Sequence, residues 1–174
     1  GELEQGGASM STVAIVVIVV VAVAALFLLI GVVWFAYDSN KRVRDFAHST
    51  DLIPGKAGRA PQSWTTDTSR EALLHQRIRY AMLDVHQNPA LPHDDSLVAA
   101  RDRLDDAAFA LDDRLIAVSA TADGDDHDDA LARAEKAIKA LEKLPKKLWE
   151  APTDQQLEDL TRVTDALRAG AAIE

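Results

Sequence analysis

The sequence contains no cysteine. This absence excludes disulfide-stapled scaffolds, thiolate metal sites and cysteine nucleophiles, because each of them needs a thiol. Nucleophile and phosphate-binding motifs are also missing: there is no Gly-x-Ser-x-Gly, and PGKAGR at residues 54–59 lacks the spacing of a phosphate-binding loop. We therefore predict a protein that is not an enzyme and that uses no cofactor.

Charge is absent from a long stretch near the N-terminus, since no charged residue lies between Glu4 and Asp38. As a helix, residues 13–37 would span about 37 Å at about 1.5 Å per residue, which exceeds a bilayer core of about 30 Å. The many Val and Ile residues would favour a strand in water, but a helix satisfies its own backbone hydrogen bonds in lipid. The residues before the run include no Lys or Arg, and no small-x-small cleavage site follows it. These features predict a retained transmembrane anchor.

The charges that flank this span predict its orientation. Lys41, Arg42 and Arg44 follow it and no basic residue precedes it, so we expect the N-terminus outside and the C-terminal part in the cytoplasm. Trp34 and Tyr37 are expected at the inner headgroup level. The bias towards Ala, Asp, Arg and Val is typical of a GC-rich bacterial genome, which places the anchor in a bacterial cytoplasmic (inner) membrane.

Composition divides the rest of the chain. We expect residues 1–9 to be a remnant of recombinant expression, 10–47 to be the anchor with a juxtamembrane helical extension, and 171–174 to be a C-terminal tail. Two Pro and two Gly within residues 54–61 predict a linker over 48–66. The remaining segment, 67–170, is expected to be a cytoplasmic helical bundle.

Apolar residues recur at helical spacing throughout residues 67–170. Four stripes begin at Leu74, Leu97, Leu131 and Leu157, and Pro145 is expected to end or restart the third helix. Gly170 is expected to end the fourth. The fold class is thus predicted as all-α: one N-terminal transmembrane helix followed by a small antiparallel bundle of three to four helices, with no strand.

No metal site is predicted. Glu71 and His75 are four residues apart, unlike the Glu-x-x-His pairs of metal-binding bundles, and His75 and His86 are expected to be solvated or to cap helices. In the acidic turn Asp123–Asp129, Asp128 and Ala134 would occupy the Gly and Glu positions of a calcium loop. A weak divalent-cation site at this turn stays open as an alternative.

Three surfaces are expected to make contacts outside the chain. A shallow small-residue stripe on the anchor could receive another membrane helix: Ala14, Ala25, Ala36. A second group would lie at lipid headgroups: Trp34, Tyr37, Lys41, Arg42, Arg44, Lys56, Arg59, Trp64. For Trp64, a place over the bundle core is an equal alternative.

The third surface is a basic face, Lys136, Lys139, Lys143 and Lys147, which could dock on an acidic partner. Pairing of this basic helix with the acidic helix over residues 94–118 is the alternative. Nucleic acid is not expected, because the domain is acidic and has no aromatic stacking platform beside these lysines.

The order of one apolar span, Tyr-Asp-Ser, a basic stretch and Asp51-Leu-Ile-Pro54 resembles that of the LemA family of membrane-anchored helical bundle proteins. The match does not extend beyond Pro54 into the predicted bundle, so the chain is not assigned to that family and no site residue is carried over from it.

These observations favour a non-enzymatic, single-pass accessory or scaffold subunit that docks onto a larger membrane protein complex. One alternative is an inner-leaflet lipid-interacting module that uses the basic residues after the span. Another is a metal-binding enzyme or sensor within the bundle.

Overall fold

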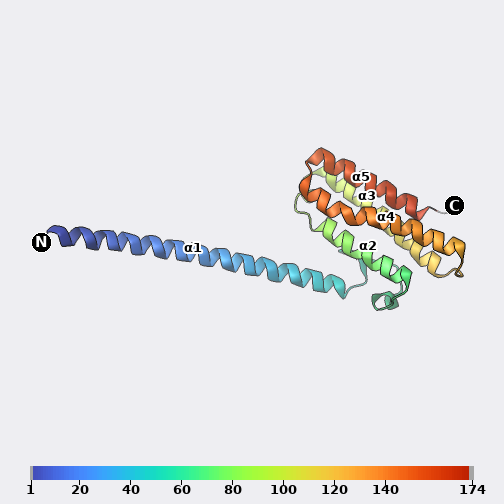
Figure 1. Cartoon of the computed structure of the whole chain (residues 1–174), viewed down its shortest axis with the longest axis horizontal. Helices are drawn as coiled ribbons and strands as arrows, with labels where there is room; N and C mark the ends of the chain where they lie inside the picture. The colour runs from blue at the N-terminus through green and yellow to red at the C-terminus, as the bar shows by residue number, and fades with distance from the viewer. Residues whose placement is uncertain (1, 173–174) are drawn as a thin grey trace. The chain divides into compact units, whose positions relative to one another are not determined.

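The computed structural model describes residues 2–172, with side chains for residues 11–38 and 40–172. The chain is 81% helical with five α-helices and almost no sheet. The chain divides into two compact units, Gly1–Ser49 and Thr50–Glu174. Figure 1 shows their elements in chain order from blue to red. The predicted all-α class is confirmed.

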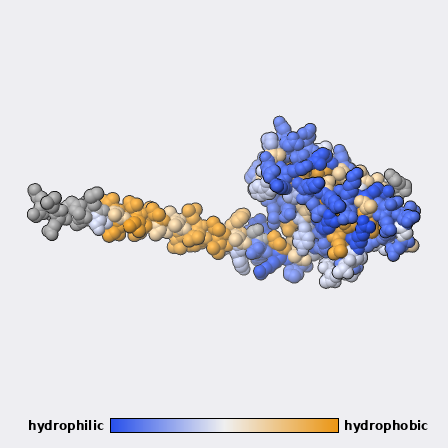
Figure 2. All heavy atoms as spheres, viewed as in Figure 1, coloured by the Kyte–Doolittle hydropathy of each residue, from blue (hydrophilic) through white to orange (hydrophobic). Residues whose placement is uncertain are grey.

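The first unit consists of one helix, α1 (Glu2–Ala47). Its stretch Ser11–Ala47 is long and apolar enough, by length and composition, to cross a membrane. No side chain between residues 11 and 37 is buried, and the apolar residues of this helix form the hydrophobic surface in Figure 2. Arg44 lies in the last turn, where a basic group favours the negative end of the helix dipole. The apolar run therefore forms one continuous helix, as predicted.

The second unit begins with a small β-hairpin in a segment that was predicted to be a linker. Strand β1 (Asp51–Ile53) pairs antiparallel with β2 (Lys56–Ala57), and Gly55 adopts a φ of 82° in the turn between them. A short 3-10 helix, η1 (Gln62–Thr65), follows. Leu52 and Ile53 are fully buried. The predictions of an unstructured linker and of no strand were wrong here, because these apolar residues cover the core of the helices that follow.

Four helices complete the second unit: α2 (Arg70–His86), α3 (Asp95–Ser119), α4 (Asp125–Glu150) and α5 (Thr153–Ala171), with a 3-10 helix η2 (Leu91–His93) between α2 and α3. Ser69 Oγ accepts a hydrogen bond from the Ala72 amide and so caps α2. Asp94 caps α3 in the same way through the Leu97 amide. Side-chain capping therefore stabilises the starts of α2 and α3, whereas the N-cap residues of α4 and α5, Gly124 and Pro152, make no side-chain cap hydrogen bond.

Two helix boundaries differ from the prediction. Helix α4 continues through Pro145 to Glu150, so the proline neither ends nor restarts it. Helix α5 continues past Gly170 to Ala171. Of the predicted C-terminal tail, Ala171 is helical, Ala172 is the C-cap, and residues 173–174 lie outside the described residues.

The helices pack through the predicted apolar stripes. Helix α5 lies along both α3 and α4, and α2 contacts α4 and α3 (Figure 1). Leu157, at the start of the fourth stripe, is only partly buried against the core. The other stripe residues listed here for α3, α4 and α5 are at most 3% exposed: Leu97, Leu104, Leu111, Val118, Leu131, Ala134, Ile138, Leu141, Leu144, Leu160, Val163, Leu167. A Cβ atom on Gly170 would lie 2.8 Å from the Ala137 Cβ, so this glycine permits the close approach of α5 to α4. The apolar residues that recur at helical spacing therefore form most of the core between these helices.

Candidate functional site

The basic face lies on the solvent side of α4. Lys136, Lys139, Lys143 and Lys147 are all exposed, on the side of the helix opposite the buried Ala134, Ile138 and Leu141. None of the four forms an ion pair with any residue whose side chain the structure describes. The expected alternative, pairing of these lysines with the acidic helix α3, is not observed within that part of the chain.

Glutamates on another edge of α4 do have partners. Glu135 contacts Arg70 and Arg77, each at 3.2 Å, and Arg77 also reaches Glu142 at 2.5 Å. Hydrogen bonds from Arg70 and Arg77 hold the pKa of Glu135 below its ordinary value, and the bond to Glu142 raises the pKa of Arg77. Helix α4 thus has an edge that is ion-paired with α2, and a basic face that forms no ion pair with a described side chain.

An acidic face lies on the outer side of α5. Asp154, Glu158 and Asp165 are exposed and form no ion pair with a described side chain. They border an open depression of about 680 Å³ whose lining comes from α5 alone. Because one helix supplies all of its walls, this depression is a space between neighbouring side chains on the outer face of α5 and not a substrate cleft.

Acidic side chains of α3 have partners from the hairpin segment. Lys56 Nζ lies 3.1 Å from Asp105 Oδ2, and Arg59 lies 2.6 Å from Asp113. The Arg59 guanidinium also lies over the Phe109 ring at 5.0 Å. The basic residues expected at lipid headgroups therefore include two, Lys56 and Arg59, that contact the second unit itself.

Trp64 is the one residue of the expected lipid group that is buried. It is 5% exposed, and its ring meets the His75 ring edge-on with centroids 5.4 Å apart. Its expected place at the headgroups is wrong, because the ring is covered by the core. The alternative place over the core is the one observed.

Three buried or half-buried histidines each contact a carboxylate from another element. His75 Nδ1 lies 2.6 Å from Asp112 Oδ1, and His86 Nε2 lies 2.7 Å from Asp105 Oδ1. His127 Nε2 lies 2.7 Å from Glu71 Oε1. The prediction that His75 and His86 are solvated or cap helices was wrong, because their rings lie between packed helices. We call these contacts the histidine–carboxylate row.

The row joins α2 to α3 and to the start of α4. Asp105 and Asp112 are fully buried, and the second oxygen of Asp112 has no hydrogen-bond partner among the described residues. Arg79 lies nearby and its pKa is lowered by burial, against the opposing effect of Asp51 and Asp112. No described group of three His, Asp or Glu side chains is arranged to hold a metal ion. The arrangement orients rings and holds helices together.

A spacing signal for this row was present in the sequence. Asp105 and Asp112 are seven residues apart, each directly after a core leucine of the α3 stripe, and Glu71, His75 and Arg79 recur every four residues on α2. Such polar residues beside an apolar stripe lie at the edge of the helix contact, where burial needs a partner.

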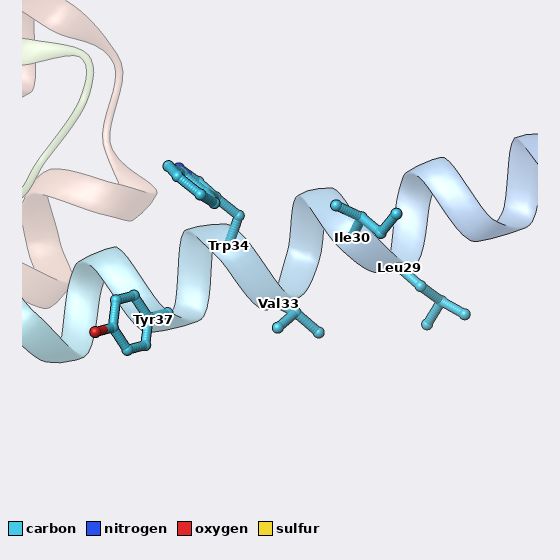
Figure 3. Close-up of a pocket in the computed structure, with 5 residues that line it drawn as sticks. All are labelled: Leu29, Ile30, Val33, Trp34 and Tyr37. Atoms are coloured by element: carbon cyan, nitrogen blue, oxygen red, sulfur yellow. The ribbon is translucent and has the colours of Figure 1, made fainter.

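The anchor residues lie on α1. Ala14, Ala25 and Ala36 are exposed, as are Lys41 and Arg44, while Arg42 pairs with Asp38 at 2.8 Å. A groove of about 350 Å³ is lined by five side chains of α1: Leu29, Ile30, Val33, Trp34, Tyr37. Figure 3 shows that these side chains project from successive turns of the same helix. The groove is therefore a gap between neighbouring side chains of one apolar helix.

Comparison of the chain with protein-family models, with curated proteins and with solved structures gives no match in any of the three.

Proposed function

We propose that the protein is a non-enzymatic, single-pass accessory or scaffold subunit of a bacterial inner-membrane protein complex. One observation carries the proposal: every apolar side chain of residues 13–37 is exposed, with Trp34 and Phe35 each 75% exposed. An exposed apolar surface of this length needs an apolar surrounding, and lipid or a second membrane helix provides one. The stripe Ala14, Ala25 and Ala36 is the proposed contact for such a helix.

The proposed topology places the N-terminus outside and the helical unit in the cytoplasm. It rests on Lys41, Arg42 and Arg44, because basic residues next to a span favour the cytoplasmic side. The packing of α2 to α5 supports an up-and-down antiparallel bundle as the cytoplasmic domain. The basic face of α4 is the proposed docking surface of that domain.

The non-enzymatic part of the proposal rests on the position of the histidines. Each ring of the histidine–carboxylate row is used to connect two elements of the second unit. A general base needs room beside it for the proton that it abstracts, and Trp64 covers the ring of His75. These contacts support a structural role for the groups that could otherwise act as acids or bases.

Site-specific photo-cross-linking in the native membrane would test this function. A benzophenone side chain at Ala25 and another at Lys143 should each capture a stoichiometric partner. Matched controls are Phe27, on another side of α1, and the exposed Ala117 of α3, where we expect no such capture. If all four positions yield only the free monomer, the accessory-subunit proposal is wrong.

A second candidate function, binding of anionic lipid, is favoured by Lys41 and Arg44, which are exposed and have no ion-pair partner among the described side chains. It predicts that the purified chain retains anionic lipid in preference to zwitterionic lipid, and that salt weakens the preference. The triple variant Lys41→Gln, Arg42→Gln, Arg44→Gln should lose the preference for anionic lipid. Equal retention by the variant and the unmodified chain would exclude this function.

A further inference from the structure

Two outer faces of the second unit carry opposite charges at the same spacing. On α4, Lys136, Lys143 and Lys147 are separated by seven and then four residues. On α5, the same intervals separate three acids in reverse chain order: Asp165, Glu158, Asp154. We call the first group the lysine stripe and the second the acidic stripe.

Each stripe occupies one side of its helix, because residues four and seven apart lie on the same face. From its first to its last charged residue, each stripe advances by eleven residue steps, which is about 16 Å at about 1.5 Å per residue. If an α4 helix and an α5 helix lay antiparallel with these faces together, each lysine would oppose a carboxylate. The pairs would be Lys136 with Asp165, Lys143 with Glu158, and Lys147 with Asp154.

The two stripes do not meet within one chain. The lysine stripe lies opposite the buried Ile138 and Leu141, and the acidic stripe lies opposite the buried Leu160 and Val163. All six charged side chains are exposed and none has an ion-pair partner within 4.0 Å among the described side chains. Arg162, which interrupts the acidic face, contacts Asp159 at 3.3 Å. The six charges therefore face solvent in a single copy.

We infer that the lysine stripe of one copy docks on the acidic stripe of a second copy. A two-fold axis parallel to the helices would make the contact reciprocal, so that each copy uses both stripes and the dimer closes. This inference deepens the proposed function, on which it rests for the membrane anchor and for the docking role of α4, and it names the partner as a second copy of this chain.

The anchor decides whether such a contact forms. Exposed ion pairs each contribute little and are screened by salt, so free helical units would hardly associate in dilute solution. Two copies anchored in the same bilayer have a much higher effective concentration, which makes a weak contact sufficient. Association is thus expected in membranes and is expected to fall as the salt concentration rises.

Disulfide cross-linking gives a direct test, because the chain has no cysteine of its own. The full-length variants Lys143→Cys and Glu158→Cys, with tags of different length, would be reconstituted together into vesicles of neutral lipid and oxidised. We expect a cross-linked heterodimer at several times the level given by Ala110→Cys, an exposed position on α3, mixed with Glu158→Cys. Equal cross-linking in the two mixtures would overturn the inference, because collision alone would explain it.

Charge exchange tests the same contact without cysteine. The triple variant Lys136→Glu, Lys143→Glu, Lys147→Glu should not associate with itself, and neither should Asp154→Lys, Glu158→Lys, Asp165→Lys. A mixture of the two should regain association, because each variant then offers the charge that the other needs. Energy transfer between labelled copies in vesicles measures all three cases. No recovery in the mixture would overturn the inference.

Failure of this inference can be told from failure of the proposed function. Capture of a different membrane protein from Lys143, without cross-linking between copies, would support the accessory role and overturn the self-docking. Cross-linking between copies, without any other captured protein, would support the self-docking and contradict the role in a larger complex.

Discussion

Charges on α2 and α3 differ from charges on the outer faces of α4 and α5 in whether they have partners inside the fold. The α3 carboxylates Asp105 and Asp112 are fully buried and contact histidines of α2. The lysine and acidic stripes are exposed and unpaired among the described side chains. The difference teaches that this acidic chain uses charge in two ways: the buried carboxylates of α3 connect it to α2, whereas the charges of the two stripes have no ion-pair partner among the described side chains.

Burial explains why the first group must be paired. Removing a carboxylate from water costs several kcal/mol, and only a close hydrogen-bonded partner repays that cost. An exposed lysine has no such cost, because water solvates it. The comparison can therefore be tested by removing charged side chains one group at a time and measuring the change in the free energy of unfolding.

The largest effect is expected for Asp112→Ala. This change leaves His75 buried beside Trp64 without its 2.6 Å partner, and breaking a buried pair typically costs about 3 kcal/mol or more. Urea unfolding of the full-length chain in detergent, followed by circular dichroism, measures the loss. Helix α1 should stay folded in the micelle, so the transition reports the second unit.

The matched control for this variant is Asp113→Ala, one residue further along α3. The Asp113 side chain is 46% exposed and contacts Arg59, so its removal should cost less than about 1 kcal/mol. Equal losses for the two variants would show that burial does not separate the two groups of charges.

Helix positions in the second unit could be predicted because one side of each helix is apolar. Leu104, Leu111 and Leu115 recur at helical spacing and are fully buried. The hairpin could not be predicted in this way: β1 and β2 are short, and Pro54 and Gly55 suggested a loop. Their stability comes from covering a core that is built by residues distant in sequence, and local patterns do not record that.

The candidate docking face was predicted more fully than the histidine–carboxylate row. The spacing of Lys136, Lys139 and Lys143 requires only a helix, so periodicity was enough to place them on one side. His75 and Asp112 are 37 residues apart, and their contact depends on which helices pack together. Periodicity also could not show whether these lysines pair with α3 or are exposed to solvent. The packing of α4 on α5 and α2 determines this, because it leaves the lysine side of α4 uncovered.

A smaller effect, and one that depends on pH, is expected for Glu135→Gln on the paired edge of α4. Arg70 and Arg77 lower the pKa of Glu135 from its ordinary value of 4.5, so the folded state holds the ionised form more strongly than the unfolded state does. The resulting stability is present above pH 4.5 and is lost as the pH falls through the lowered pKa. Glu135 is 32% exposed, which keeps the expected loss in the variant below about 1 kcal/mol at pH 7.

Urea unfolding at several pH values measures this effect. The difference in free energy of unfolding between the unmodified chain and Glu135→Gln should shrink towards zero in acid. Glu150→Gln serves as the control, since Glu150 is exposed on the same helix and has no ion-pair partner among the described side chains. A difference that stays constant with pH would mean that the arginine contacts do not stabilise the fold.

The smallest effect, and one of opposite sign, is expected for the double variant Lys136→Gln, Lys143→Gln. These lysines repel Lys139 and Lys147 at intervals of three and four residues, and such like-charge pairs destabilise a helix by about 0.2–0.5 kcal/mol each. Gln and Lys have similar helix propensities, so the free energy of unfolding should rise by a few tenths of a kcal/mol at low salt. The gain should disappear at high salt, where the repulsion is screened. A loss of stability would show that these lysines have attractive contacts within the fold, and would place them with the buried charges of α2 and α3.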